Sequence, residues 1–546
     1  MLRPGCTVTT EVTLARSQEP NTVGSVPSVA RTVTSIAPPN GPAVGPSTRR
    51  LEAVRSGVAS NTLRSMGWVF VLSAACFIAF AGYLGFSRFG TLRLGKDTDR
   101  PEFRTSSWIA MMFSAGMGIG LMFYAVAEPI SHLGAPPLGL ECAGTPDAGR
   151  LAMQYTYFHW ALTPWAIYGV VGLALGYVCM RKGRPNLISE AFRPLIGDRV
   201  EGPIGKGIDI LAIWATLFGS ATSLGFGAAQ VNSGLNFLWD VPISDTLAVL
   251  IIVVLTALFV LSATTGVEKG IQFLSNLNMV LAIVLLLFIL VVGPTVFIAQ
   301  TFVDATGAYL YNFIPMSLDS GAFGGGEWLN SWTIFYWAWW ISWAPFVGTF
   351  LARISRGRTI REYLLGVLIV PSGVSFIWFA ILGGSAIDLQ LSGQADLIQA
   401  AAKPEVALFT TLEQFPLSAI SSFLVIILVS LFFVSGADAA SVVMGTMSSR
   451  GALEPSRAVV VVWGSLTGLS AAVLLVAGGL TGLQQAAIIA AAPFVIIMLG
   501  TCVGLMKEMR EEHYVTPVAI QPRAAAPPGG PGGPAVATGE MPASPS

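Results

Sequence analysis

Charged residues are scarce in this sequence. Lys, Arg, Asp and Glu make up 11% of the 546 residues, and 30 basic residues balance 30 acidic ones. A protein that binds nucleic acid usually carries a basic patch, and this balance indicates none. With 53% hydrophobic residues and 59 glycines, the composition is instead that of an all-α polytopic membrane protein.

Cysteine and histidine are also rare. The five cysteines show no CxxC spacing, which argues against a disulfide framework or a zinc site. The histidines, His132, His159 and His513, lie far apart, so their spacing alone predicts no haem or metal cluster. Paired histidines, a serine with a base and clustered carboxylates are not evident either. We therefore predict no enzyme active site and no cofactor.

Long apolar runs fill the middle of the chain. Residues 1–65 are rich in Ser, Thr and Pro and lack the apolar core of a signal peptide, so they are predicted to be a disordered tail. The Pro/Gly/Ala-rich residues 508–546 are predicted to be a second tail. Between them, residues 66–507 contain about 11 predicted transmembrane helices. These are Gly67–Phe86, Trp108–Val126, Thr156–Met180, Ile208–Leu235, Thr246–Ser262, Leu277–Phe297, Trp328–Leu351, Tyr363–Leu382, Ile420–Phe433, Val459–Ala477 and Ala486–Leu505.

Basic residues predict how these helices are oriented. The loops after the first and third predicted helices are rich in Lys and Arg, whereas the alternate loops hold only Arg150 and Lys403. Because short cytoplasmic loops accumulate Lys and Arg, the C-terminus is predicted to be cytoplasmic. An odd number of helices then puts the N-terminal tail outside. Either a first helix is absent from this chain, or the tail is exported despite its arginines.

Aromatic rings concentrate in two predicted helices. The stretch Ser331–Phe350 and the third predicted helix together hold Trp332, Trp337, Trp339, Trp340, Trp343, Trp160, Trp165 and Tyr168. Spanning helices usually carry such rings at the water interfaces, but here they lie in mid-helix. Aromatic faces in a dry site attract a cation that cannot hydrogen-bond, such as a quaternary ammonium. Bulky packing is the alternative for any single ring; the cluster as a whole predicts a binding cage.

Glycine and hydroxyl patterns indicate two further features. Gly116, Gly118 and Gly120 occupy every second position of the second predicted helix, which favours a break that lines a cavity; a close-packing face is the alternative. Thr216 and Ser220 lie four residues apart, so both hydroxyls face the same way and could bind a hard cation. Alternatively, they bond to their own helix backbone.

Two other segments carry weaker signals. Apolar residues recur at helical spacing from Phe302 to Met316, which predicts an amphipathic helix along the outer interface. Asp438 is a lone acid among small residues in the LFFVSGADAASVVMG segment. An acid within a span is a functional candidate, although near the cytoplasmic end it could be solvated.

Five segments resemble one transporter family. They are PEFRTSSWIAMMFSAGMGIGLMFYAVAEP, FHWALTPWAIYGVVGLALGY, GVEKGIQFLSNLNMVLA, SWTIFYWAWWISWAPFVGTFLARISRGRTIREY and ADAASVVMGTMS. In this order they resemble the betaine/choline/carnitine transporter family, and its sodium-coupled glycine betaine members in particular. The resemblance implies a leucine-transporter-type fold of two inverted five-helix repeats, about 106–300 and 328–506, with the interfacial helix at about 302–318. The family's additional helix before the first span is missing here.

The resemblance also implies the site residues. Its aromatic cage falls on Trp160, Trp165, Tyr168 and Trp340, with Trp343 on the permeation path. The unwound segment through Ala115, Met117 and Gly118 would meet the substrate carboxylate with backbone groups. One sodium site would use Thr216, Ser220 and the Phe346 ring. The second would use Ser114, Met117, Phe432, Ser435 and Gly436, where Gly436 stands in place of the usual hydroxyl residue and offers backbone only.

The function implied is import of glycine betaine or a related methylated osmolyte with sodium across the plasma membrane. Choline-selecting relatives tend to place an aspartate in the glycine segment, and its absence here favours a zwitterion. A homotrimer that involves the interfacial helix is also implied. The alternatives are sodium-independent exchange of the carnitine type, although the matching fourth and ninth spans contain no Arg or Lys, and an inactive or sensor relative. A channel is disfavoured because a mid-membrane cage should trap its ligand.

Overall fold

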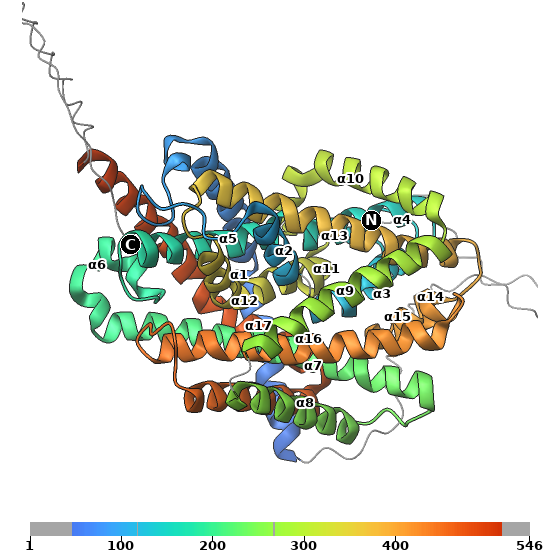
Figure 1. The fold of residues 1–546 in the computed structure, drawn as a ribbon. Coiled ribbons are helices and arrows are strands. Elements are labelled where there is room, and N and C mark those ends of the chain that lie inside the picture. Colours follow the sequence, from blue (N-terminus) through green and yellow to red (C-terminus); the bar gives the residue numbers. More distant parts are fainter. Residues whose placement is uncertain (1–45, 117, 266–267, 516–546) are drawn as a thin grey trace, which may run out of the picture.

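The computed structural model describes residues 46–116, 118–265 and 268–515. These residues form a helical bundle without strands, in which a single isolated bridge pairs Arg93 with Thr359. In Figure 1 most helices run across the view, with α10 along the upper right edge and α8 along the lower edge. An all-helical membrane fold is what the composition predicts.

The bundle has seventeen α-helices and six short 3₁₀- or π-helical segments within the described residues. The α-helices are α1 (Pro46–Phe86), α2 (Thr105–Gly116), α3 (Ile119–Gly134), α4 (Pro146–Trp160), α5 (Leu162–Gly176), α6 (Arg193–Ile196), α7 (Pro203–Trp239), α8 (Asp245–Thr265), α9 (Glu268–Val292), α10 (Thr295–Leu318), α11 (Gly326–Leu329), α12 (Phe335–Ile354), α13 (Ile360–Leu391), α14 (Leu397–Ala401), α15 (Pro404–Glu413), α16 (Ser418–Ser448) and α17 (Arg457–Val515). The short segments are η1 (Arg88–Thr91), η2 (Pro137–Gly139), η3 (Tyr177–Arg181), η4 (Ser189–Phe192), η5 (Gly197–Glu201) and η6 (Asn330–Ile334).

Within the described residues, six helices are long and apolar enough to cross a membrane, or seven if the bent pair α9–α10 counts as one span. Each of the eleven predicted segments lies on helix, but several of those helices are broken or bent. The number of crossings and the two inverted repeats therefore stay predictions.

Both predicted tail boundaries need correction. α1 begins at Pro46, so residues 46–65 are helical rather than part of the tail. Two of the hydroxyl residues that indicated disorder bond back to their own helix: Thr62 Oγ1 donates to the Val58 carbonyl at 2.9 Å and Ser65 Oγ to the Asn61 carbonyl at 2.8 Å. Residues 1–45 lie outside the described residues.

At the other end, α17 continues to Val515, beyond the predicted boundary at residue 508. Two of its acids, one helical turn apart, pair with basic residues that follow α5. Glu508 lies 2.6 Å from Arg184 and Glu512 lies 2.5 Å from Arg181. These contacts keep the last turns of α17 against the bundle. Residues 516–546 lie outside the described residues.

Helix breaks shape the centre of the bundle. α4 ends at Trp160 and α5 begins at Leu162, with Ala161 outside helical geometry (φ −103°, ψ −119°). Pro164 explains this break, because a proline lacks an N–H group and clashes with the carbonyl four residues earlier, which belongs to Trp160. Gly118, just before α3, is extended rather than helical (φ −158°, ψ −179°), as the glycine spacing predicts. α17 bends at Gly478 and Gly479.

α12 lies in the core and carries most of the aromatic stretch. Trp337 and Trp339 are among the largest fully buried side chains. Backbones of α5 and α12 approach closely where each has a glycine: a Cβ on Gly172 would lie 2.8 Å from the Gly348 carbonyl oxygen. This contact brings the rings of the two helices together.

The segment predicted as an interfacial helix is α10, which turns by 110° from the end of α9. Ala305, Tyr309 and Met316 on its predicted apolar face are buried, whereas Tyr311 and Ile314 on the other side are 86% and 69% exposed. Asp438 on α16 is buried, with 7% exposure, so the solvated alternative for this acid is wrong.

Candidate functional site

The four predicted cage residues and Trp343, predicted on the permeation path, line one cavity. Trp160 ends α4, Trp165 and Tyr168 lie on α5, and Trp340 and Trp343 lie on α12. The Trp160 and Trp340 ring centres are 4.9 Å apart, those of Trp165 and Tyr168 are 5.5 Å apart, and those of Tyr168 and Trp340 are 6.3 Å apart. All three pairs meet edge to face, and all four rings line the cavity.

The aromatic stretch divides into rings that line the cavity and rings that pack elsewhere. Trp339 was not predicted as a cage residue, yet it lines the cavity and stacks on Trp340 with ring centres 4.7 Å apart. Trp337 packs away from the cavity, against Phe158, and Trp332 contacts Tyr124 and His132. The packing alternative therefore holds for Trp337 and Trp332, while binding by the rings that line the cavity stays a prediction. Helical spacing from Trp339 to Trp343 could have indicated the extra ring.

The broken glycine segment closes one side of the cage. Gly118, Gly120 and Leu121 line the cavity at the start of α3. A Cβ on Gly120 would lie 2.9 Å from ring atoms of both Trp160 and Trp339, whereas one on Gly118 would meet nothing within 4 Å. The break and the close approach thus occur in the same segment. Met117 and the side chains of Ser114 and Ala115 lie outside the described residues.

We expect Gly120→Ala to reduce solute binding by about tenfold, because moving two packed indoles costs about 1–3 kcal/mol. The measurement is the dissociation constant of the purified protein for its solute. Gly307→Ala on α10, where a Cβ would meet no atom within 4 Å, is the matched control and should leave binding unchanged. Equal affinity of the two variants would contradict the close approach.

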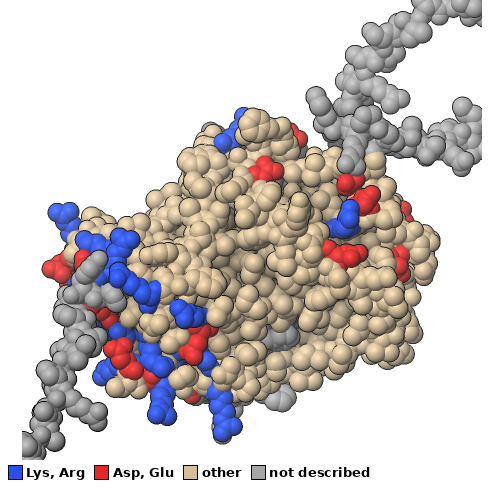
Figure 2. Space-filling model, turned by 90° about the horizontal axis from the view of Figure 1, so that it is seen from above, with Lys and Arg blue, Asp and Glu red and all other residues tan. Residues whose placement is uncertain are grey.

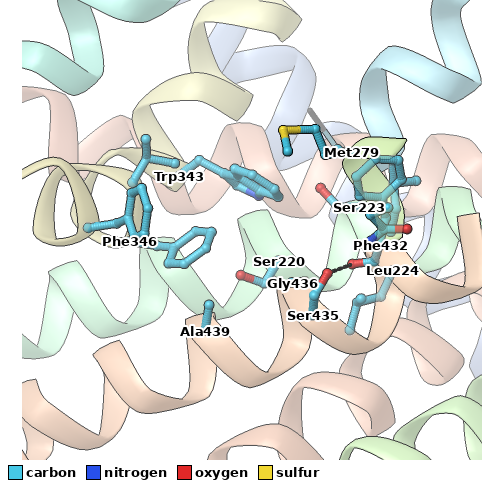
Figure 3. A pocket seen from close by; sticks show the side chains of 15 residues that line it. Ser220, Ser223, Leu224, Met279, Trp343, Phe346, Phe432, Ser435, Gly436 and Ala439 are labelled. Atoms are coloured by element: carbon cyan, nitrogen blue, oxygen red, sulfur yellow. Dashed lines mark hydrogen bonds between the residues drawn. The ribbon is translucent and has the colours of Figure 1, made fainter. Parts of the chain in front are cut away.

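A second cavity adjoins the cage and is lined by the hydroxyl residues Ser220, Ser223 and Ser435 (Figure 3). Gly118, Ser223, Trp343 and Val347 line both cavities. The second cavity brings together the following members of the two predicted sodium sites: Ser220, Phe346, Phe432, Ser435 and Gly436. Asn278 of α9 also lines it and was not predicted.

Two oxygens in this second cavity lack partners within the described part of the chain: Ser220 Oγ and Asn278 Oδ1, both buried. Ser435 Oγ donates to the Leu431 carbonyl at 2.8 Å and keeps its lone pairs. Thr216 Oγ1 donates to the Ala212 carbonyl at 2.9 Å and does not line the cavity. The backbone-bonding alternative thus holds for Thr216, while Ser220 has an oxygen free to accept.

A buried polar cluster behind the cage was missed from the sequence. Glu128 Oε1 lies 2.6 Å from His159 Nδ1 and 3.3 Å from His132 Nε2. Glu128 Oε2 accepts from Trp160 Nε1 at 2.6 Å and from the Tyr336 hydroxyl at 2.5 Å. Two of the histidines that seemed unrelated therefore share one carboxylate. Glu128 escaped notice because it follows the predicted end of the second helix, Val126, by two residues.

Glu128, His132 and His159 form the one group of three His, Cys, Asp or Glu side chains in the described chain whose ligand atoms approach within 4.8 Å of one another. Those atoms face one another as hydrogen-bonding pairs. The other carboxylate oxygen is occupied by indole and phenol donors, and an indole N–H cannot coordinate a metal. The geometry favours a hydrogen-bonded network.

Comparison with known proteins identifies the family of this chain. Residues 44–514 match the family described as "BCCT, betaine/carnitine/choline family transporter". The chain belongs to this transporter family. It is 49% identical to the "Glycine betaine transporter OpuD" of Bacillus subtilis. The 451 aligned residues cover 82% of this chain and 88% of that protein.

Two further relatives show the range of solutes in the family. The chain is 45% identical to the "Probable glycine betaine transporter" of Desulfitobacterium hafniense, over 82% of this chain and 90% of that protein. It is 40% identical to the "High-affinity choline transport protein" of Escherichia coli, over 83% of this chain and 67% of that protein. The predicted family is confirmed, and this is a multi-pass membrane transporter rather than an enzyme.

Proposed function

We propose that this transporter imports glycine betaine, or a related quaternary-ammonium or methylated osmolyte, together with sodium by alternating access. The cage carries the proposal: Trp160, Trp165, Tyr168, Trp340 and Trp343 surround one cavity. Aromatic faces bind a permanent cation, with about 2 kcal/mol per desolvated contact. Trimethylammonium groups have no hydrogen to donate, so such a cage suits them.

The start of α3 supports a zwitterionic solute. Backbone N–H groups in the first turn of a helix have no partner within that helix and carry partial positive charge. α3 begins at Ile119, and Gly118 and Gly120 line the cage. A carboxylate would be stabilised there while the ammonium group lies among the rings. The close approach of Gly120 to Trp160 and Trp339 leaves little room for an acidic side chain at that position.

Sodium coupling is supported by the adjoining cavity. Hard cations prefer oxygen ligands, and Ser220, Ser223 and Ser435 line this cavity beside Gly118, which it shares with the cage. An ion held there would lie next to the bound solute. A tenfold sodium gradient supplies about 1.4 kcal/mol, and about 100 mV adds about 2.3 kcal/mol for each charge. One ion would thus support roughly 500-fold accumulation of a neutral zwitterion.

Uptake into proteoliposomes tests coupling. With sodium outside, labelled glycine betaine should accumulate; with potassium in its place, accumulation should fall to the level of protein-free vesicles. Ser220→Ala should raise the half-saturating sodium concentration by about tenfold, as expected for loss of one polar ligand. Ser385→Ala, a buried hydroxyl on α13 that bonds to the Ile381 carbonyl, is the control. Unchanged uptake in potassium would reject symport in favour of exchange.

The proposed location is the plasma membrane, with a cytoplasmic C-terminus. Figure 2 shows Lys and Arg gathered toward one end of the molecule, and the positive-inside rule assigns that end to the cytoplasm. Accumulation of an osmolyte would protect the cell under osmotic stress. A homotrimer through α10 is also proposed, since Leu310, Tyr311 and Ile314 leave an apolar face exposed there; the mass of the solubilised protein tests it.

A further inference from the structure

Glu128 is a buried carboxylate whose acceptor positions are filled. Four donors converge on it: His159 and His132 on Oε1, and Trp160 and Tyr336 on Oε2. Two carboxylate oxygens offer about four lone-pair sites, and a protonated carboxyl group would use one oxygen to donate. None of the four partners needs a donor from Glu128. The hydrogen bonds therefore match the ionised form.

The contacts of the two histidine partners of Glu128 fit their neutral forms. His132 has no partner for Nδ1 among the described residues, so this buried nitrogen matches a bare lone pair, with the proton on Nε2. His159 Nε2 lies 2.9 Å from Thr333 Oγ1, a hydroxyl that can donate to it. Within the described chain, only these two histidines lie at ion-pair distance from Glu128. With both histidines in these neutral forms, the network holds one negative charge, that of Glu128.

Trp160 links this charge to the cage. Its Nε1 donates to Glu128 on one side, and its ring lines the solute cavity on the other. A hydrogen bond to an anion polarises the donor, which makes the face of the indole more negative. Cation–π attraction depends on that negative potential. Buried charges are stabilised by partners, and a cation in the cage would be the missing partner of Glu128.

We propose that Glu128 is a fixed anion behind the cage that determines specificity for a positively charged solute group, acting through the Trp160 indole. Glu128 is a positioning and specificity-determining residue, and the carboxylate does not enter the cavity. This inference rests on the proposed function. It explains why a carboxylate, rather than a backbone carbonyl, anchors one wall of an otherwise apolar cage.

The test compares two ligands of the same shape. Glycine betaine and tert-butylacetate differ in that a carbon replaces the quaternary nitrogen, so only betaine is cationic at that end. Dissociation constants for both are measured with the purified full-length chain in lipid nanodiscs. Glu128→Gln should lower the preference for betaine over tert-butylacetate by about tenfold or more, since one buried charge interaction is worth at least that factor.

A merely structural role gives a different result. Distortion of the cage would weaken the binding of both ligands alike. An unchanged preference for betaine over tert-butylacetate in Glu128→Gln would therefore overturn the inference. His132→Gln is the matched control: it replaces one neutral N–H donor by another, and the preference should stay within about threefold. An equal loss in the control would overturn the assignment of the charge to Glu128.

Two further outcomes are also decisive. If Glu128→Gln is not monodisperse, Glu128→Asp keeps the charge but moves it one methylene from Trp160, and the preference should fall by about threefold; no fall would overturn the inference. If the wild-type protein binds no betaine, the proposed function fails and this inference falls with it. If the protein binds betaine and the preference is the same in all variants, the role of Glu128 is rejected while the proposed function stands.

Discussion

Trp340→Leu is expected to raise the betaine concentration for half-maximal uptake by about thirtyfold or more. Trp340 is central to the cage: its ring centre lies 4.9 Å from that of Trp160, 4.7 Å from Trp339 and 6.3 Å from Tyr168. Leucine keeps an apolar side chain but has no π face, and a desolvated cation–π contact is worth about 2 kcal/mol, or roughly thirtyfold in affinity. The measurement is saturable uptake into proteoliposomes.

The control for this prediction is Trp214→Leu. Trp214 lies on α7 with 56% of its surface exposed, away from both cavities, so its loss should leave the half-saturating concentration unchanged. Both variants are compared at equal amounts of reconstituted protein. If Trp340→Leu takes up betaine with wild-type affinity, the rings serve packing and the cage proposal is wrong.

Gly172→Val is expected to abolish uptake by separating α5 from α12. A Cβ on Gly172 would lie 2.3 Å from the Tyr363 hydroxyl and 2.8 Å from the Gly348 carbonyl oxygen. Tyr363 is held in place, because its hydroxyl donates to the Gly169 carbonyl at 3.1 Å. Neither the Tyr363 hydroxyl nor the Gly348 carbonyl can move aside without strain, and overpacking a tight contact costs about 1–3 kcal/mol or more. Uptake and the midpoint of thermal unfolding should both fall.

Gly373→Val on α13 is the matched substitution, since a Cβ there would have no neighbour within 4 Å. It should fold and transport like the wild type. Gly172→Val with normal uptake and an unchanged unfolding midpoint would show that the two helices can part without loss of the cage.

Much of the architecture follows from the sequence. Apolar runs longer than a bilayer crossing require helices, because backbone groups in lipid must bond internally. The glycine spacing predicts the break before α3, and the aromatic stretch predicts the cage. Helix ends are less predictable: α1 extends back to Pro46 and α17 on to Val515, because back-bonded hydroxyls and ion pairs stabilise turns that look like tails in composition.

The parts that escaped prediction depend on contacts between distant segments. Trp337 and Trp339 are two residues apart on one helix, and only the packing of α12 decides that Trp339 lines the cavity while Trp337 meets Phe158. His159 and Glu128 are thirty-one positions apart in the chain, and no local sequence pattern predicts their hydrogen bond. Asn278 reaches the second cavity from α9, again through tertiary packing.

The glycine contact between α5 and α12 has a consequence for the transport cycle. Two helices that touch backbone to backbone cannot tilt or slide independently without a clash, so Trp165, Tyr168 and Trp340 should move as one rigid unit. Opening toward either side of the membrane must then come from parts outside this pair. Gly118, extended just before α3, is such a part, because a backbone outside the helix can pivot at little cost.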